Sequence, residues 1–414
     1  MRKVKRIGFM GLGKLGLPCS LAVEHFGGYS VLAYDPAPGV AEILESRVLP
    51  FQEENAQDLL EQTAIRLVST VELVKKSDLI FIPIQTPHEP RYEGITRLPE
   101  ERQGFDYTYL RDGISQLSYE CARQKRSTIL VIISTVLPGT VDKVIRPLLN
   151  SYTRLVYNPF FIAMGTCIED FVHPEFILLG VDDPKTADEV EDFYRGFIDA
   201  PVERMSIASA EMTKVSYNTA ITSKICIANT IMEMCHRIPG ANCDDVTRAM
   251  QHATKRVVSP MYMGGGMGDG GGCHPRDNIA LSALAQQLGL SYDWYEHLMK
   301  CREAQAEWLA DMMMSYTLPK VILGITFKPE TDLVTGSPAL LIKNLLEEKG
   351  ATVHTYDPDL PETTDKLPTG AAVFLIGCKK DEFVGWDFPA GSIVIDPHRF
   401  IPDQDGVQVI RIGE

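Results

Sequence analysis

The sequence predicts an α/β fold in which two related domains are joined by a long central helix. Short apolar runs rich in β-branched residues alternate with helix-length stretches at both ends of the chain, a pattern typical of parallel sheets covered on both faces. Residues 209–237 contain neither Pro nor Gly and carry apolar residues at helical spacing. The motif VLAYDP at 31–36 is echoed by VHTYDP at 353–358, which indicates that both sheets belong to Rossmann-like domains.

The first predicted domain covers residues 1–205. Its apolar run Val4–Met10 leads into GLGKLG at 11–16 and then into Leu17–Phe26, which we expect to be an amphipathic helix. This order is typical of a strand, a tight turn and a helix. Further strands of one parallel sheet are expected at Ser30–Tyr34, Leu79–Ile84, Thr128–Ile133, Leu155–Tyr157 and Phe176–Leu179.

The middle region, residues 206–310, is predicted to be helical. A helix over Ser209–Arg237 would carry apolar side chains at Met212, Val215, Ile221, Ile225, Ala228 and Met232. Residues 263–272 then hold seven glycines in ten. Because ordering glycine costs backbone entropy, this segment is either a flexible linker or a loop whose backbone approaches a ligand. Its abrupt end in CHPRD at 273–277 favours the loop.

The last predicted domain covers residues 311–414 and repeats the pattern of the first. Its strands are expected at Val321–Thr326, Ala351–Tyr356, Ala372–Gly377 and Ser392–Ile395.

Composition excludes several classes of function. The formal net charge is −15 and the basic residues are scattered, so no nucleic-acid partner is expected. No apolar run approaches the roughly 20 residues that cross a bilayer, and no signal-peptide core follows the basic start, so we expect a cytoplasmic protein without membrane contact. The nine cysteines show no CxxC pair or Cys/His cluster, so neither a disulfide framework nor a metal site is expected.

The glycine turn predicts a dinucleotide site. Gly11 permits the turn, Gly13 lets the backbone approach a pyrophosphate, and Gly16 lets helix and strand pack closely. Asp35 follows the next strand, 19 residues beyond Gly16, where it would bind the adenine ribose hydroxyls. Residues 36–39 contain no Arg for a 2′-phosphate, so the predicted cofactor is NAD. The expected contacts of this turn are Gly11, Leu12, Gly13, Lys14, Leu15, Gly16 and Asp35.

Polar residues end two later strands of the first domain. Thr86 and Pro87 follow the strand at 79–84, and Ser134 and Thr135 follow the strand at 128–133. Ligands of open α/β sheets bind beyond the carboxyl ends of strands, so these residues are candidates for the nicotinamide side of the site, with Thr135 also a candidate catalytic residue. Turn formation and helix capping are the alternative roles.

On the predicted central helix, Glu211, Lys214 and Asn218 fall at spacings of three and four and share one face. Such a trio usually forms solvated surface. A lysine and an amide that face an enclosed site could instead hold an alkoxide or an oxyanion.

Together these motifs resemble the UDP-glucose/GDP-mannose dehydrogenase family, in the right order over nearly the whole chain. The matching stretches are GLGKLGLP at 11–18, QTP at 85–87, STVLPGT at 134–140, EMTKVSYN at 211–218, GGGCHPRD at 270–277, GITFKP at 324–329 and SPAL at 337–340. The resemblance implies an NAD-binding domain, a central helical region that forms a homodimer or an assembly of dimers, and a C-terminal domain that binds the nucleotide of a nucleotide-sugar substrate.

The resemblance also implies a four-electron oxidation of a sugar C6 alcohol to a carboxylate, with two NAD used in turn. Lys214 and a water held by Asp277 would assist alcohol deprotonation, and Asn218 would hold developing negative charge. Cys273 would capture the aldehyde as a thiohemiacetal, which can give up a second hydride to become a thioester.

Further positions are implied to contact the substrate. Phe327 and Lys328 belong to the substrate-binding stretch, Arg399 resembles an arginine near the sugar, and Arg256 resembles an arginine lent across the dimer. The expected substrate-binding residues are Phe161, Ile162, Lys214, Asn218, Arg256, Tyr262, Phe327, Lys328 and Arg399.

The chain departs from the family pattern near the expected site. The family motif Asn-Pro-Glu is Asn158-Pro159-Phe160 in this chain, so Phe160 stands where the glutamate is expected. Met164 stands where a second family glutamate is expected. A phenyl ring can neither activate water nor carry a proton in thioester hydrolysis. Arg276 replaces a lysine, and Thr335-Gly336 replace the arginine expected before Ser-Pro.

These changes leave three hypotheses for the activity. The chain completes the oxidation of a nucleotide hexose with another group activating water. Alternatively it oxidises an unusual nucleotide-linked substrate, stops at the aldehyde or works reversibly. A non-catalytic binding homologue is the third hypothesis, against which the presence of Cys273, Lys214, Asn218 and Asp277 argues.

Overall fold

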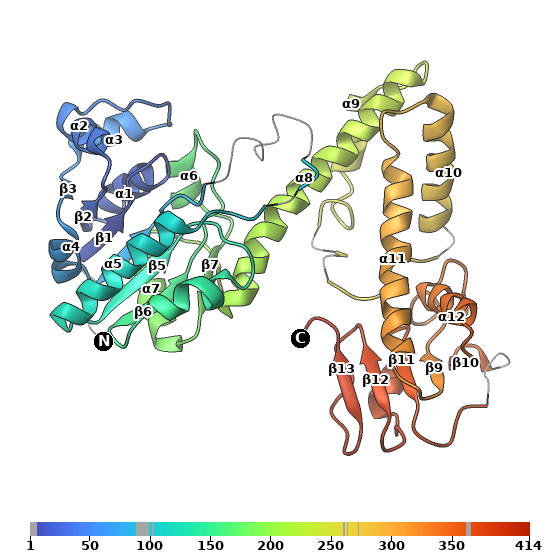
Figure 1. Cartoon of the computed structure of the whole chain (residues 1–414). Helices are drawn as coiled ribbons and strands as arrows, with labels where there is room; N and C mark the ends of the chain where they lie inside the picture. Colours follow the sequence, from blue (N-terminus) through green and yellow to red (C-terminus); the bar gives the residue numbers. More distant parts are fainter. Residues whose placement is uncertain are drawn as a thin grey trace. The chain divides into compact units, whose positions relative to one another are not determined.

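In the computed structural model the described residues are 6–87, 99–101, 103–259, 261–262, 264–271, 273–361 and 366–414. They form two compact units, Met1–Thr222 and Ser223–Glu414, and each is described by itself (Figure 1). The first two residues of the predicted strand Val4–Met10, and residues 263 and 272 of the glycine segment, lie outside the described residues. The three-part division at residues 205 and 310 stays a prediction.

The first unit contains an eight-stranded sheet in the order β3-β2-β1-β4-β5-β6-β7-β8. Its strands are β1 (Arg6–Met10), β2 (Ser30–Tyr34), β3 (Arg66–Leu67), β4 (Leu79–Ile82), β5 (Thr128–Ile132), β6 (Thr153–Tyr157), β7 (Ile177–Val181) and β8 (Val202–Met205). Every strand expected from the sequence is present, whereas β3 and β8 were not predicted.

The expectation of a wholly parallel first sheet is wrong at one position. Strand β7 pairs with β6 antiparallel, although β8 is parallel to β7. A connection between antiparallel neighbours starts and finishes at the same end of the two strands. The segment between β6 and β7, which contains α6 (Cys167–Val172), therefore needs no crossover. A continuous apolar run reads the same in either direction, which is why the sequence did not show it.

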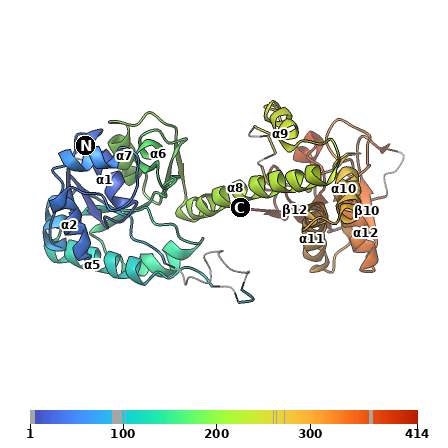
Figure 2. The same cartoon turned by 90° about the horizontal axis from the view of Figure 1, so that it is seen from above.

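Helices cover both faces of this sheet. One apolar layer involves α1 (Gly16–His25), α3 (Ala56–Gln62), α6 and α7 (Pro184–Tyr194), and the other involves α4 (Thr70–Lys76), α5 (Thr108–Gln124) and the short π-helix at Val141–Ile145. Figure 2 shows α1, α6 and α7 on the side opposite α5. Helix α1 is buried throughout Gly16–Val23, so it is an internal helix and not the amphipathic one expected. This unit also contains α2 (Pro38–Ser46), a short 3-10 helix at Arg146–Leu148 and the beginning of α8 (Ile207–Arg237).

The second unit contains a five-stranded parallel sheet in the order β10-β9-β11-β12-β13. Its strands are β9 (Lys320–Leu323), β10 (Val353–Tyr356), β11 (Val373–Ile376), β12 (Ile393–Asp396) and β13 (Gln408–Arg411). The four expected strands are present and β13 is additional. One face packs against α11 (Trp294–Met314) and α12 (Pro338–Glu348), and the fold class expected from the sequence is confirmed.

The two echoed motifs do the same structural work. In the first sheet, Asp35 accepts a hydrogen bond from the N–H of Leu12 at 2.7 Å. In the second, Asp357 accepts from the N–H groups of Ile325 and Thr326 at 2.7 and 2.9 Å. Each aspartate therefore ties the turn after the first strand of its sheet to the end of the neighbouring strand, and the internal repeat is structural.

The predicted central helix is present as α8, which spans Ile207–Arg237 and is followed by α9 (Cys243–Gln251) and α10 (His274–Leu288). Large apolar side chains of these helices are exposed. They include Met212, Ile221, Ile225, Met232, Val246 and Ile279. Among the described residues, no helix combines the length and apolarity that a membrane crossing requires.

Candidate active site

The glycine turn after β1 is closed by the backbone and by one carboxylate. Gly11 has a φ of +112°, and its N–H donates to the carbonyl of Tyr34 at 2.9 Å. The carboxylate of Asp35 accepts from Leu12 through Oδ2 and from the N–H of Ala37 through Oδ1, at 2.7 and 2.9 Å. A carboxylate has about four lone-pair directions, so Asp35 retains capacity for ribose hydroxyls.

The same turn fits the pyrophosphate of NAD. A Cβ at Gly16 would lie 2.2 Å from the carbonyl oxygen of Gly11, whereas a Cβ at Gly13 would meet no atom within 4 Å. Helix α1 thus packs as closely on the turn as glycine permits, while the backbone at Gly13 stays open. Lys14 is exposed and Leu15 half-buried beside it, at the helix N-terminus where anions bind.

The polar residues after β4 and β5 join two loops. The hydroxyl of Thr86 donates to the carbonyl of Thr135 at 3.0 Å, and the hydroxyl of Ser134 donates to the carbonyl of Ile84. The carbonyl of Pro87 accepts a backbone N–H. The hydroxyls of Thr86 and Ser134 therefore join the loops after β4 and β5, and their place in a nicotinamide site stays a prediction.

Two of the three polar residues on α8 are buried. Glu211 is 1% exposed and accepts from the N–H groups of Gly139 and Val141 at 2.6 and 2.7 Å, so it fixes the STVLPGT loop to the helix. Lys214 is 8% exposed, whereas Asn218 is exposed. Solvated surface is therefore the wrong description of Glu211 and Lys214.

Lys214 lies against aromatic rings. Its Nζ is 4.9 Å from the ring centroid of Phe161, which lies 4.7 Å from that of Phe176 and 4.6 Å from that of Tyr217. The hydroxyl of Tyr217 donates to Glu175 at 2.9 Å. Burial lowers the pKa of Lys214, because an apolar environment disfavours the ammonium.

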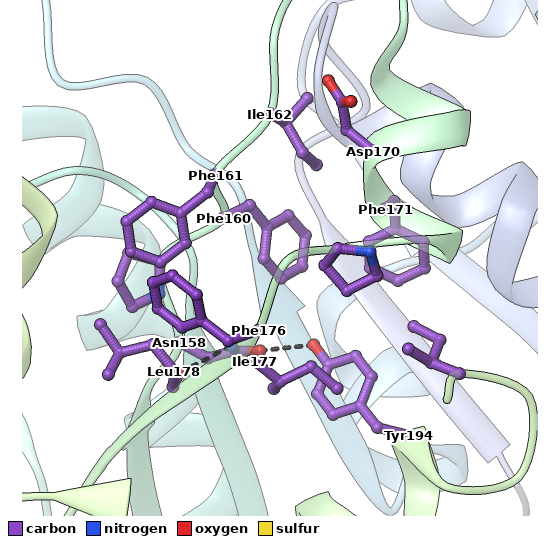
Figure 3. Close-up of a pocket in the computed structure, with 13 residues that line it drawn as sticks. Asn158, Phe160, Phe161, Ile162, Asp170, Phe171, Phe176, Ile177, Leu178 and Tyr194 are labelled. Carbon is purple, nitrogen blue, oxygen red and sulfur yellow. Dashed lines mark hydrogen bonds between the residues drawn. The ribbon is translucent and has the colours of Figure 1, made fainter. Parts of the chain in front are cut away.

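Phe160 points away from this cluster into an apolar pocket. Figure 3 shows Phe160 turned toward Phe171, and Phe161 turned toward Phe176. The ring of Phe160 lies 5.1 Å from that of Phe171 and 6.4 Å from that of Phe81. The side chain at position 160 therefore belongs to the packing between the sheet and α6.

Replacing Phe160 by glutamate is expected to lower the free energy of unfolding by about 3 kcal/mol, because a carboxyl would enter an apolar pocket. Phe160→Leu is the control, since it keeps the site apolar at a cost of about 1 kcal/mol. Urea unfolding of both variants measures the difference. Equal stability would contradict the inward orientation of this ring.

Other carboxylates near Phe160 support the loop that follows it. Asp170 accepts from the N–H of Ala163 at 2.8 Å, and Glu53 accepts from the N–H of Gly165 at 2.9 Å. Met164, between them, is 64% exposed. The loop is held by its backbone, and the second replaced glutamate position faces solvent in this unit.

In the second unit, the glycine segment 264–271 packs on the C-terminal sheet domain. A Cβ at Gly270 would lie 2.9 Å from the Cβ of Phe327 and 3.0 Å from the carbonyl oxygen of Gly336. Gly271 has a φ of +86° and also faces the Phe327 ring. Glycine is required here because the backbone of the segment packs directly on the backbone at Gly336. The segment is therefore a packed loop and not a flexible linker.

Arg399 holds the start of this loop. Its guanidinium donates to the carbonyl of Gly265 at 2.6 Å, and to the carbonyls of Pro397 and Ile412 at 2.7 and 2.8 Å. Arg399 itself has a φ of +57°. The predicted substrate residues Phe327 and Arg399 are thus brought to the loop that precedes Cys273.

Cys273 occupies the N-cap position of α10 and its side chain is exposed. Its carbonyl accepts from the N–H of Asp277 at 2.8 Å. The carboxylate of Asp277 accepts from Arg276 at 2.8 and 2.9 Å, and this hydrogen bond and the charge of Asp277 raise the pKa of Arg276. A cation, a carboxylate and the thiol therefore share the first turn of α10.

The other predicted substrate residues vary in setting. Arg256 and Tyr262 are exposed, and Tyr262 has a φ of +64°. The Nζ of Lys328 lies 5.5 Å from the ring centroid of its neighbour Phe327. Ile162 is half-buried against the apolar core of the first unit.

The structure groups the predicted residues within each unit. The first unit joins the glycine turn to Asp35, the loops after β4 and β5 to each other, and Lys214 to Phe161. The second unit joins Phe327 and Arg399 to the Cys273 loop. Sequence reasoning missed Tyr217 and Glu175, whose contact spans 42 positions and leaves no local pattern. Within the described part of the chain, no group of three metal-ligating side chains occurs.

Three models of one family match the chain, each described as a domain of the UDP-glucose/GDP-mannose dehydrogenase family. The NAD binding domain matches residues 5–198, the central domain 208–303 and the UDP binding domain 321–385.

Curated relatives span most of the chain. GDP-mannose 6-dehydrogenase of Pseudomonas aeruginosa is 28% identical over 366 residues, which are 85% of this chain and 81% of that protein. UDP-glucose 6-dehydrogenase TuaD of Bacillus subtilis is 27% identical over 379 residues, 87% of this chain and 78% of that protein. The crystal structure of a ternary complex of GDP-mannose dehydrogenase from Pseudomonas aeruginosa has the same fold, with a TM-score of 0.86 at 24% identity over 98% of this chain and 99% of that chain.

Proposed function

Because the chain belongs to the UDP-glucose/GDP-mannose dehydrogenase family, we propose that it oxidises the C6 alcohol of a UDP-hexose-class nucleotide sugar to the carboxylate through Cys273. It is an NAD-dependent nucleotide-sugar dehydrogenase, an oxidoreductase. One observation carries the proposal: Cys273 is exposed at the N-cap of α10, at the end of a glycine loop packed on the domain that matches the UDP binding model.

Bound NAD supplies a hydride acceptor for each of the two oxidations. The turn at Gly11–Gly16 would hold its pyrophosphate, and Asp35 would bind its ribose. Neutral Lys214 takes the proton of the C6 hydroxyl, which its lowered pKa makes feasible. Asn218 donates hydrogen bonds to the oxygen on which negative charge develops.

Cys273 then converts the aldehyde into a form that can be oxidised again. Its sulfur bonds to the carbonyl carbon, the oxygen takes up a proton, and a thiohemiacetal results. Loss of its carbon-bound hydride and its hydroxyl proton leaves a thioester on Cys273. Water cleaves the carbon–sulfur bond, which releases the carboxylate and restores the thiol. A water held by Asp277 assists Lys214 in the earlier deprotonation of the alcohol.

Hydrolysis is the step that the sequence weakens. Phe160 carries no ionisable group and faces an apolar pocket. A specific second candidate therefore follows: the chain oxidises a different nucleotide-linked substrate, or stops at the aldehyde or works reversibly because the thioester is cleaved slowly.

Counting NADH per sugar separates these candidates. The protein is incubated with UDP-glucose, GDP-mannose and UDP-N-acetylhexosamines in turn. Two NADH per sugar, with a uronate product, support full oxidation of that substrate. One NADH, or a burst that stalls with a sugar mass on Cys273 after acid quench, supports the second candidate. No NADH with any sugar would overturn both in favour of a binding homologue.

The pH dependence of alcohol oxidation follows from Lys214. Because the neutral amine is the base, kcat/KM is expected to rise with pH through the lowered pKa of Lys214. Phe161→Ala admits water to Lys214, so the rise should move to higher pH, toward the ordinary lysine value. Phe26→Ala, an exposed ring of the same unit, is the control. A profile that does not move in Phe161→Ala would contradict this role.

The helical middle, residues 206–310, is proposed to form a homodimer. The exposed apolar side chains of α8, α9 and α10 support this. Soluble monomers rarely expose large apolar patches, and such patches commonly mark protein–protein interfaces. Mass measurement under native conditions tests it. A monomer at micromolar concentration would overturn it.

A further inference from the structure

Arg302 lies on α11 and joins the glycine segment 264–271 that precedes Cys273, here called the Cys273 loop, to the backbone at Gly336. Its Nε is 2.9 Å from the Oδ1 of Asp269 and 3.1 Å from the carbonyl oxygen of the same residue. Its terminal nitrogen donates to the carbonyl of Gly336 at 2.8 Å. The side chain of Arg302 is only 12% exposed, whereas that of Asp269 is 41% exposed, so the guanidinium is largely buried and the carboxylate is not.

The two segments that Arg302 joins touch through their backbones. Gly336 has a φ of +67°, and a Cβ there would lie 2.5 Å from the carbonyl oxygen of Gly271. A side chain at Gly336 would not fit between them, and the apolar contact of Phe327 with Gly270 and Gly271 is not directional. The guanidinium, with its fixed fork of donors, adds directional contacts that fix the register of the two segments.

Asp269 also lies close to the residue that follows Cys273. Its Oδ2 lies 3.7 Å from the Nδ1 of His274, the residue that follows Cys273. The side-chain amide of Gln305, one turn beyond Arg302 on α11, donates to the carbonyl of Gly266 at 3.2 Å. One face of α11 therefore contacts the glycine segment at residues 266 and 269.

We propose that Arg302, acting through Asp269, is the positioning residue that sets the Cys273 loop for thiohemiacetal formation. This rests on the proposed function of Cys273. A glycine-rich segment samples many conformations when free, so a fixed anchor is needed to place the sulfur within reach of a substrate carbon. Lysine cannot replace the arginine, because a single ammonium does not span both segments.

The first test is kinetic. Arg302→Gln and Asp269→Asn are each expected to lower kcat about 100-fold, as a misplaced reacting group does. The Kd for NAD should stay within about twofold, because the NAD site lies in the first unit. The double variant should be no worse than Arg302→Gln alone. Arg302→Lys should restore less than about a tenth of the lost activity.

Wild-type kcat in Asp269→Asn, which removes a charge from an exposed loop and should fold, would overturn the proposal. Additive losses in the double variant would also overturn it. Arg248→Gln breaks an exposed ion pair with Asp245 on α9 and serves as the matched control.

The second test needs no turnover. Amide hydrogen exchange in residues 264–271 should rise in Arg302→Gln and Asp269→Asn, and exchange in the first unit should not change. Faster exchange in these variants, together with no NADH from any sugar with the wild-type protein, would support the anchoring role of Arg302 and refute the proposed chemistry. Unchanged exchange would refute the anchor whatever the substrate is.

Discussion

Cys273→Ala is expected to yield a protein that forms no uronate and releases at most one NADH per sugar, with the overall rate lowered at least about 1000-fold. The alanine cannot bond to the aldehyde, and a free aldehyde has no hydride to give until it is hydrated. NAD binding and the unfolding temperature should be unchanged, because Cys273 is exposed and its side chain supports no packing.

The control for this variant is Cys301→Ala, which removes another exposed thiol from α11. It should retain wild-type stoichiometry. Products are quantified by mass spectrometry beside NADH absorbance, so an aldehyde intermediate is seen directly. A Cys273→Ala protein that still makes uronate at a wild-type rate would remove the covalent mechanism and leave only the fold and the family.

Phe160 and Phe161, adjacent in one loop, face two different environments. Phe160 extends an aromatic layer that includes Phe171, and Phe161 on the other side covers Lys214. A single loop thus contributes both to packing and to the environment of the proposed base. Burial among these apolar side chains lowers the pKa of Lys214, which favours its neutral amine.

Much of the fold could be predicted because its signals are local. Strand, glycine turn and helix follow one another within residues 6–25, and both YDP motifs mark equivalent strand ends. The direction of β7 and the short edge strands could not be predicted, since two to five residues of apolar sequence carry no information about their neighbours.

The site was less accessible from sequence. Residue type and spacing were enough to predict roles for Gly11, Asp35 and Cys273. Arg302 does not, because its partners Asp269 and Gly336 lie more than thirty positions away on either side. Likewise, the role of Ser134 as a link between loops depends on a strand that is adjacent in space and distant in sequence.

Gly16→Ala is expected to raise the Kd for NAD about 100-fold, equivalent to about 2.7 kcal/mol. The new Cβ would lie 2.2 Å from the carbonyl oxygen of Gly11 and 2.8 Å from the ring of Pro83. Backbone atoms cannot yield as a flexible side chain can, so α1 must move away from the turn. The backbone N–H groups that face the pyrophosphate then lose their alignment.

A destabilised fold would also weaken NAD binding, so the control must crowd the same domain without touching the turn. Gly8→Ala does this, because its Cβ would lie 2.7 Å from the side-chain oxygen of Ser77. Calorimetric titration with NAD at a temperature where both variants are folded measures the difference. If Gly8→Ala weakens NAD binding as much as Gly16→Ala, the loss comes from general strain in the sheet. A selective loss in Gly16→Ala would instead place the pyrophosphate at the N-terminus of α1.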